Sequence, residues 1–382
     1  MEVFHREALA ASMAEQILVV SPTSAAGAGL FLAAPRRTGK STFLREDLRP
    51  QLEKRGALVV YVDLWEDRKA DPGEAIVKAV RAELAAHDGV VKRLARAAGM
   101  EKVVVGGVSF SLDRVGLGTG ISLSAALSAL SDETGQVIVL VIDEAQHAIT
   151  SDKGSDALFA LKAARDELNS SRHKGLRVVA TGSNRDKLAM LRSSREQAFF
   201  GAPLVSFPAL GEDYVQWFCE RVALPAALDP VATFELFKRA SFRPELLGAA
   251  ADSLRFDFSL TEQDVPARFA AAVEEQIAAS HAEMLRVIHS LTPLQSAVLR
   301  VLAKRRGAYA PFEAATLDAY QAVLKATDPS VELKADVPSI QQALAALQDK
   351  ALVWRATRGV YALEEASLAD LMAQEGLLAQ VP

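Results

Sequence analysis

The sequence predicts an α/β protein: a parallel five-stranded core sheet, a helical lid after it, and a C-terminal winged-helix domain. Between residues 30 and 207, short apolar segments alternate with helical patterns, which is typical of parallel strands joined by helical crossovers. Residues 137–142 are consecutively apolar, a pattern that indicates a strand buried on both faces. Later segments are mainly helical until two short apolar runs, which indicate a hairpin turning near Arg358-Gly359.

The core elements follow in order from the N-terminus. Residues 1–28 are predicted to form an amphipathic helix and a lead-in loop, ahead of a core domain at 29–209. The predicted core elements are strands at 30–34, 57–64, 137–143, 176–181 and 204–207, with helices at 40–55, 71–86 and 156–167. An insertion at about 102–123 alternates apolar with small or polar residues, which predicts a β-hairpin. A solvated linker is the alternative, because glycines weaken strands.

A loop of the phosphate-binding kind joins the first strand to its helix. Backbone N–H groups of such a loop, with the positive end of the helix dipole, form a cradle for phosphate oxygens. Lys40 is predicted to supply charge to the outer phosphates, and the Ser41 hydroxyl to ligate Mg²⁺. Ala34 stands where the first glycine of this motif usually lies, and alanine is small enough there unless the junction needs positive φ. The predicted nucleotide-binding residues are Pro35, Arg36, Arg37, Thr38, Gly39, Lys40, Ser41 and Thr42.

Two carboxylates follow the apolar run at 137–142. Asp143 and Glu144 fall at the carboxyl edge of the predicted sheet, where open α/β proteins bind ligands. Asp143 is predicted to hold the Mg²⁺ shell, and Glu144 to polarise an attacking water. Together with the loop, these residues predict binding and hydrolysis of ATP.

The second half of the chain is predicted to form two further domains. A lid and connector at 210–290 contains predicted helices at 212–222, 230–240, 244–255 and 265–289. The winged-helix domain covers 291–382, and its first helix is predicted to be capped by Thr292, with Pro293 in the first turn. Helices at about 311–326 and 338–350 and two strands within 352–363 complete it.

Composition limits the class of protein. The chain of 382 residues has a formal net charge of −5, so no global field attracts it to nucleic acid. No apolar run approaches the length that spans a bilayer, and the N-terminus lacks a signal-peptide pattern. The single cysteine, Cys219, cannot form an internal disulfide, and we expect a cytoplasmic protein with no membrane partner.

The chain resembles the AAA+ superfamily within the ASCE P-loop ATPases. More narrowly, it is similar to the archaeal-type ATPase clade related to the STAND NTPases and the origin-recognition initiator ATPases. The resemblance covers most of the chain and depends on the segments Pro35–Ser41, Val139–Gln146, Ala180–Asn184, Ser206–Leu210, Phe242–Leu247, Ala343–Val353 and Gly359–Leu363.

The resemblance implies further site residues. Asn184 matches the sensor 1 position, which orients the attacking water, although Thr181 and Ser183 compete for that role and a helix cap is the alternative. Arg243 matches the sensor 2 arginine of the lid, with a surface arginine as the alternative.

The resemblance also implies roles for other arginines. Arg192 and Arg195 match the region of an arginine finger supplied by a neighbouring subunit, with a solvated helix face as the alternative. The chain has Phe200-Gly-Ala-Pro203 where similar ATPases often have a basic residue. Arg36 and Arg37 are typical of the clade and contact phosphates, a partner or only solvent.

Three functions are consistent with these residues. The first is a Mg²⁺-dependent ATPase whose turnover drives a conformational or assembly switch, as a homo-oligomer or with a separate effector protein. The second is an ATP-controlled initiator or transposition regulator that binds duplex DNA through the winged helix. Residues 291–365 hold nine basic and eight acidic residues, which is a smaller excess of basic residues than DNA-reading domains usually have. The third is a non-hydrolysing ATP-dependent scaffold, which would have no chemical need for Glu144.

Overall fold

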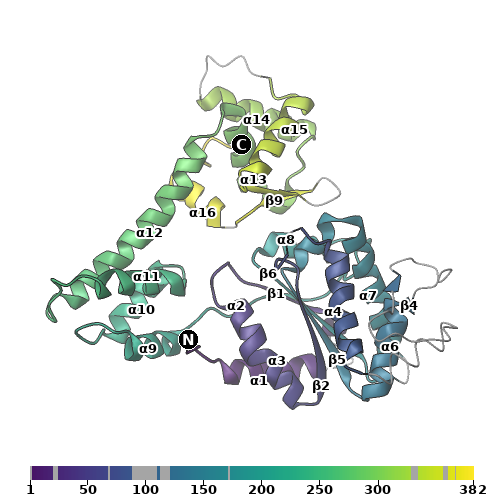
Figure 1. The fold of residues 1–382 in the computed structure, drawn as a ribbon. Helices are drawn as coiled ribbons and strands as arrows, with labels where there is room; N and C mark the ends of the chain where they lie inside the picture. Colours follow the sequence, from purple (N-terminus) through teal and green to yellow (C-terminus); the bar gives the residue numbers. More distant parts are fainter. Residues whose placement is uncertain are drawn as a thin grey trace.

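The computed structural model describes residues 2–19, 25–67, 69–87, 110–111, 121–170, 173–327, 334–355, 360–365 and 367–382. Figure 1 shows three bodies: a sheet covered by helices, a helical lid, and a C-terminal domain that a long helix joins to the lid. Among the described residues, no helix combines the length and apolarity needed to cross a membrane.

A parallel sheet forms the centre of the first body. Its strands are β1 (Leu30–Ala33), β2 (Ala57–Asp63), β5 (Val137–Asp143), β6 (Leu176–Gly182) and β7 (Leu204–Ser206), in the order β2-β5-β6-β1-β7. Every pairing in this sheet is parallel. The sequence-based prediction of five parallel strands is therefore confirmed, and β5 lies inside the sheet as its apolar run requires.

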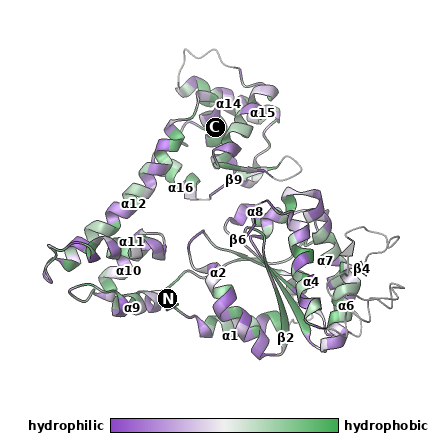
Figure 2. Ribbon diagram, viewed as in Figure 1, coloured by the Kyte–Doolittle hydropathy of each residue, from purple (hydrophilic) through white to green (hydrophobic). Residues whose placement is uncertain are grey.

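Helices cover both faces of the sheet, and Figure 2 shows its strands as largely hydrophobic. One face packs against α4 (Pro72–Ala85), α6 (Leu123–Thr134) and α7 (Asp152–Ser170), which bury leucines such as Leu127 and Leu161. The other face packs against α1 (Glu7–Leu18) and the helix that follows the phosphate loop. Short helical turns complete the core: η1 (Ala25–Ala28), η3 (Ala145–Thr150) and α8 (Arg185–Ala189).

The helix after the phosphate loop is not a single α-helix. It is divided into α2 (Lys40–Thr42), the π-helix η2 (Phe43–Leu48) and α3 (Arg49–Lys54). Pro50 lacks an N–H group and its ring crowds the preceding turn, so the hydrogen bonds before it shift, and Arg49 N donates to Leu44 O. The predicted helix at 40–55 thus has the right extent but an irregular middle.

The predicted β-hairpin at 102–123 is wrong where the structure describes it. The strands β3 (Phe110–Ser111) and β4 (Ile121–Ser122) pair in parallel, whereas a hairpin requires antiparallel strands. Alternation of apolar residues indicates extended backbone but does not fix the relative direction of two strands. Residues 102–109 and 112–120 of this prediction lie outside the described part of the chain.

The lid consists of α9 (Glu212–Arg221), α10 (Pro230–Arg239) and α11 (Pro244–Arg255), followed by the long α12 (Val265–His289). Its core includes Phe237, Leu247 and Phe269, which are at most 1% exposed. Aromatic rings also join the N-terminus to this body, since Phe4 packs against Tyr214 with ring centroids 5.5 Å apart.

The C-terminal domain contains three main helices and a hairpin. Its elements are α13 (Pro293–Arg305), η4 (Arg306–Ala308), α14 (Ala314–Thr327), α15 (Val337–Asp349), β8 (Val353–Arg355), β9 (Tyr361–Leu363) and α16 (Ser367–Gln374). The strands β8 and β9 pair antiparallel, and Thr292 caps α13 in a reciprocal capping box with Gln295. These elements are those expected of a winged helix, with α16 added.

Candidate active site

The phosphate loop lies between β1 and α2, at the carboxyl end of the sheet. Arg37 and Gly39 have positive φ angles of 62° and 80°, so the sharp turns fall there and not at Ala34. The Thr38 hydroxyl donates to Pro35 O at 2.8 Å, which fixes the loop from within. The side chain of Lys40 is only 5% exposed and points to the end of β5.

Asp143, which is fully buried, is the centre of the site. Ser41 Oγ donates to Asp143 Oδ2 at 2.6 Å, and the Tyr61 hydroxyl donates to the same oxygen at 3.1 Å. Lys40 and Thr181 both contact the other oxygen, Oδ1. Burial alone would raise the pKa of Asp143, but the Lys40 charge and the hydrogen bonds outweigh burial and lower it. The carboxylate is therefore held ionised.

Glu144 has a backbone conformation that is rare for this residue type. Its φ angle is 52°, in the left-handed region, at a cost of about 1–2 kcal/mol for a residue with a Cβ atom. Such conformations cluster at functional sites. Its side chain lies 3.4 Å from Lys40 Nζ through Oε1, and it accepts hydrogen bonds through Oε2 from Gln146 at 2.6 Å and Ser183 Oγ at 3.0 Å.

The side chain of Asn184 does not join this cluster, contrary to the sensor 1 expectation. Its Oδ1 accepts from the backbone N–H groups of Asp186 at 2.9 Å and Lys187 at 3.2 Å, so it caps α8. Its Nδ2 donates to Leu363 O at 3.0 Å in the C-terminal domain. The competing residue Ser183 is the one that contacts Glu144. The side chain of Asn184 caps α8 because the helix begins at the next residue and its first N–H groups need hydrogen-bond acceptors.

The donor set at Ser41 and Asp143 fits a magnesium ion. A hydroxyl and a carboxylate oxygen are hard ligands, and Mg²⁺ typically takes one or two such protein ligands together with water and phosphate oxygens. The two side chains are in direct contact at 2.6 Å, at the mouth of the phosphate loop.

Arg243 lies at the start of α11 and is connected to the phosphate loop through one carboxylate. Its Nε donates to Glu245 Oε1 at 2.7 Å, and the same oxygen lies 3.9 Å from Arg37. Arg243 also donates to Ser280 Oγ of α12 at 3.3 Å. The lid therefore approaches the loop through Glu245, the partner of the residue predicted to be sensor 2.

Arg192 and Arg195 lie in turns after α8, which ends at Ala189. Arg195 is exposed and Arg192 is half-buried. The sequence places both arginines at the end of the helix after Asn184, whereas in this described stretch both lie beyond that helix. Neither is among the residues that contact Asp143 or Glu144 in the described chain.

The β8–β9 hairpin of the C-terminal domain contacts the phosphate loop. Glu364, directly after β9, pairs with Arg36 of the loop at 2.8 Å and with Lys187 of α8 at 2.9 Å. Lys187 is fully buried; burial lowers its pKa, and the Glu364 charge offsets part of that effect. The sequence alone did not indicate Lys187 or Glu364, because neither belongs to a motif and the two residues lie far apart in the chain.

Aromatic rings lie close to this ion-pair cluster. Trp354 of β8 is 7% exposed and packs against Ile149 and Met190 of the core. Near Arg36, the Trp65 ring packs against His147 in a tilted arrangement with ring centroids 4.3 Å apart, and Arg36 lies over Trp65 at 5.2 Å. The hairpin thus contacts the core through an ion-pair cluster and an apolar patch.

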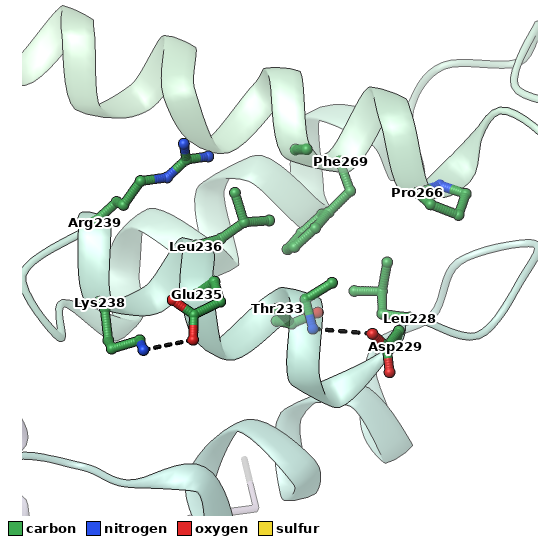
Figure 3. A pocket seen from close by; sticks show the side chains of 11 residues that line it. Leu228, Asp229, Thr233, Glu235, Leu236, Lys238, Arg239, Pro266 and Phe269 are labelled. Atoms are coloured by element: carbon green, nitrogen blue, oxygen red, sulfur yellow. Dashed lines mark hydrogen bonds and ion pairs between the residues drawn. The ribbon is translucent and has the colours of Figure 1, made fainter.

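A separate pocket of about 780 Å³ lies in the lid between α10 and α12 (Figure 3). Phe269 extends from α12 toward Leu236 of α10, and Lys238 pairs with Glu235 at 2.5 Å. All of its lining residues come from the lid, and none comes from the phosphate loop or the sheet.

The sheet order and the site together define a P-loop nucleoside triphosphatase fold, with a lysine-bearing loop after β1 and an Asp-Glu pair at the end of β5. The chain is similar to the ADP form of the ORC2 protein of Aeropyrum pernix, with a TM-score of 0.52 and 16% identity, covering 99% of this chain and 95% of that one. It is also similar to the Walker-type ATPase PABY2304 of Pyrococcus abyssi, with a TM-score of 0.50 and 16% identity, covering 97% and 96%.

These similarities extend over nearly the whole length of each chain, and they show that the fold predicted from the sequence is shared with these two solved structures. No family model matches the sequence, and no curated protein matches it. At 16% identity the likeness is one of fold, so function must be argued from the site.

Proposed function

We propose that this protein binds ATP with Mg²⁺ and hydrolyses it, and that turnover drives a conformational or assembly switch read out through the C-terminal domain. The observation that supports this most directly is the convergence of Lys40, Ser41, Asp143 and Glu144 at one sheet edge. The solved structures with this fold include an ORC2 protein in its ADP form and a Walker-type ATPase.

Each side chain has a distinct part in the proposed reaction. Lys40 binds the outer phosphates as a point charge, and backbone N–H groups of residues 35–41 bind the others. Ser41 and Asp143 would hold Mg²⁺, which when bound neutralises charge on the phosphates. Glu144 orients and polarises the water that attacks the terminal phosphorus.

The contact between Arg36 and Glu364 supports a readout through the C-terminal domain. Arg36 belongs to the phosphate loop, and its partner Glu364 follows the hairpin strand β9. A nucleotide phosphate competes with a carboxylate for the same guanidinium group, since both form paired hydrogen bonds with it. Nucleotide binding would therefore weaken the attachment of the hairpin to the core.

DNA binding through the C-terminal domain is the alternative, and its surface chemistry gives it less support. The sequence favours residues 338–350 as a recognition helix; the matching helix α15 contains no lysine or arginine between Val337 and Asp349, and Lys350 follows its last residue. In the basic run at 304–306, Arg305 donates to Thr316 Oγ1 and Arg306 pairs with Asp370. The sequence also favours Arg355 and Arg358 as wing residues; Arg355 is exposed at the end of β8, and Arg358 lies outside the described residues. Absence of ATP-dependent duplex binding at low salt, where phosphate contacts are strongest, would end this alternative.

A non-hydrolysing scaffold is the remaining alternative, and the hydrogen-bonded Glu144 argues against it. We further propose a cytoplasmic protein that assembles with copies of itself or with a separate effector protein. Arg192 and Arg195 are the candidates for a finger in such an assembly. Particle mass with and without ATP and Mg²⁺ tests this part of the proposal.

The test of the proposed activity compares two substitutions at the site. Glu144→Gln should retain ATP binding and lose turnover roughly 100-fold or more, because the group that polarises water is removed. Lys40→Ala should lose both binding and turnover, because the charge for the outer phosphates is removed. Phosphate release and calorimetric ATP binding are measured for both variants and the wild type. Wild-type turnover in Glu144→Gln would refute the assignment.

A further inference from the structure

Gln146 is a fully buried amide directly beside the proposed catalytic carboxylate. Its Nε2 donates to Glu144 Oε2 at 2.6 Å, and its side chain has no exposed surface. Burying an amide costs free energy unless it is hydrogen-bonded, and an apolar side chain of the same size would be buried at a lower cost. The position therefore favours an amide for its contact with Glu144.

The two carboxylate oxygens of Glu144 have different partners, and Gln146 contacts only one of them. Oε2 accepts from both Gln146 and Ser183 Oγ, while Oε1 lies 3.4 Å from Lys40 Nζ, the group that meets the phosphates. With Oε2 held, Oε1 is directed toward the phosphate end of the site. The left-handed backbone at Glu144 allows this, because it turns the chain back so that a side chain two residues later reaches Glu144.

The end of β6 leaves room for this amide. A Cβ atom on Gly182 would lie 2.3 Å from Gln146 Oε1 and 2.9 Å from Leu188 Cγ. Any side chain at position 182 would therefore displace Gln146 or Leu188. The absence of a side chain at Gly182 thus makes the placement of Gln146 sterically possible.

We infer that Gln146 is a positioning residue for hydrolysis: it holds Glu144 Oε2, so that Oε1 faces the attacking water beside the terminal phosphate. Ser183 is the second donor to the same oxygen. This inference rests on the proposed ATPase function. Gln146 touches neither the water nor the nucleotide, and it acts only through Glu144.

The test replaces Gln146 by methionine, which is similar in length and has no N–H donor. In the full-length protein, Gln146→Met should lower kcat roughly 10- to 100-fold and leave KM and calorimetric ATP affinity unchanged, because only the orientation of Glu144 is lost. The same substitution is then made in Glu144→Gln and followed by single-turnover hydrolysis of radiolabelled ATP. There it should cause no further loss, since residues that act as a unit are not additive.

Three results would overturn the inference: wild-type turnover in Gln146→Met, a loss of ATP affinity equal to the loss of turnover, or an equal further loss in the Glu144→Gln background. Should Gln146→Met fail to fold, Ser183→Ala removes the hydroxyl donor to Glu144 Oε2 and keeps the longer contact from the backbone N–H of Ser183 at 3.4 Å, and the same cycle applies. Absence of ATP hydrolysis by the wild-type protein would refute the ATPase proposal itself. That outcome is distinct from a failure at Gln146 alone.

Discussion

His147 lies three residues after Glu144, in surroundings that keep its imidazole ring neutral. Burial is the main cause, and it lowers the pKa of His147 from 6.5 to about 4. The nearby charges of Glu144 and Glu364 raise this pKa, while those of Lys187 and Arg36 lower it. Within the described chain, the buried Nε2 atom has no hydrogen-bond partner.

This setting predicts that the protein loses stability on mild acidification. The unfolded chain binds a proton at His147 below pH 6.5, whereas the folded chain does not until about pH 4, so stability falls as the pH falls between these values. From pH 7 to pH 5 we expect a loss of roughly 2 kcal/mol from this residue. His147→Phe keeps the ring against Trp65 and removes the titration. Urea unfolding at both pH values should show a smaller loss in the variant; an equal loss would contradict the prediction.

At the scale of residues, the sequence allowed prediction where a contiguous motif fixes the surroundings. Lys40, Ser41, Asp143 and Glu144 meet as expected, because a loop after one strand and the end of another strand share a sheet edge. The side-chain direction of Asn184 could not be predicted. It depends on where α8 begins and on Leu363, which lies far away in the chain.

At the scale of elements, α4 and α7 approach so closely that one glycine is required between them. A Cβ atom on Gly73 of α4 would lie 2.4 Å from Lys153 O of α7. Backbone atoms cannot move aside as a flexible side chain can. The close approach brings these two helices together on one face of the sheet.

Gly73→Ala should therefore destabilise the core domain by about 1–3 kcal/mol through overpacking. Gly248→Ala is the matched control, because Gly248 also lies within a helix and has nothing within 4 Å of the added Cβ atom. The control should be neutral or stabilising by up to about 1 kcal/mol, since alanine favours helix. Thermal unfolding of both variants measures the difference. Equal midpoints would argue against the close approach.

Elements were predictable when their apolar pattern was strong. β5 was clear from its continuous apolar run, and the lid helices from their spacing. Helix α6 was missed, although Ser122 caps it and Leu123, Leu127 and Leu130 are all buried. The preceding stretch alternates apolar and small residues, so it was interpreted as strand up to residue 123, where α6 begins. Pro50 gave a sign of the irregular η2 helix, but not of its π form.

At the scale of the whole molecule, Glu364 pairs with two basic residues of the core and so helps to join the C-terminal domain to it. Glu364→Ala should release the β8–β9 hairpin, because it leaves Lys187 buried without its ion-pair partner, and such a loss is strongly destabilising. We expect a larger radius of gyration by small-angle X-ray scattering.

Glu365→Ala is the control for this prediction. Glu365 is the neighbouring residue, 45% exposed, and lies 3.9 Å from Arg36. It should therefore leave the scattering profile unchanged. A Glu364→Ala profile identical to that of the wild type would show that the ion-pair cluster does not hold the two bodies together.

Helix α12 connects the lid to the C-terminal domain, while the hairpin connects that domain back to the core (Figure 1). Each of the three bodies is therefore attached to the other two, and α12 would transmit a rotation of the lid to the C-terminal domain. Its 25 residues make a rod of about 37 Å, so a lid rotation of roughly 10° moves its far end by about 6 Å. The contacts of Glu364 span 2.8 and 2.9 Å and cannot stretch so far. A lid rotation of this size must therefore either bend α12 or break the contacts of Glu364 with the core.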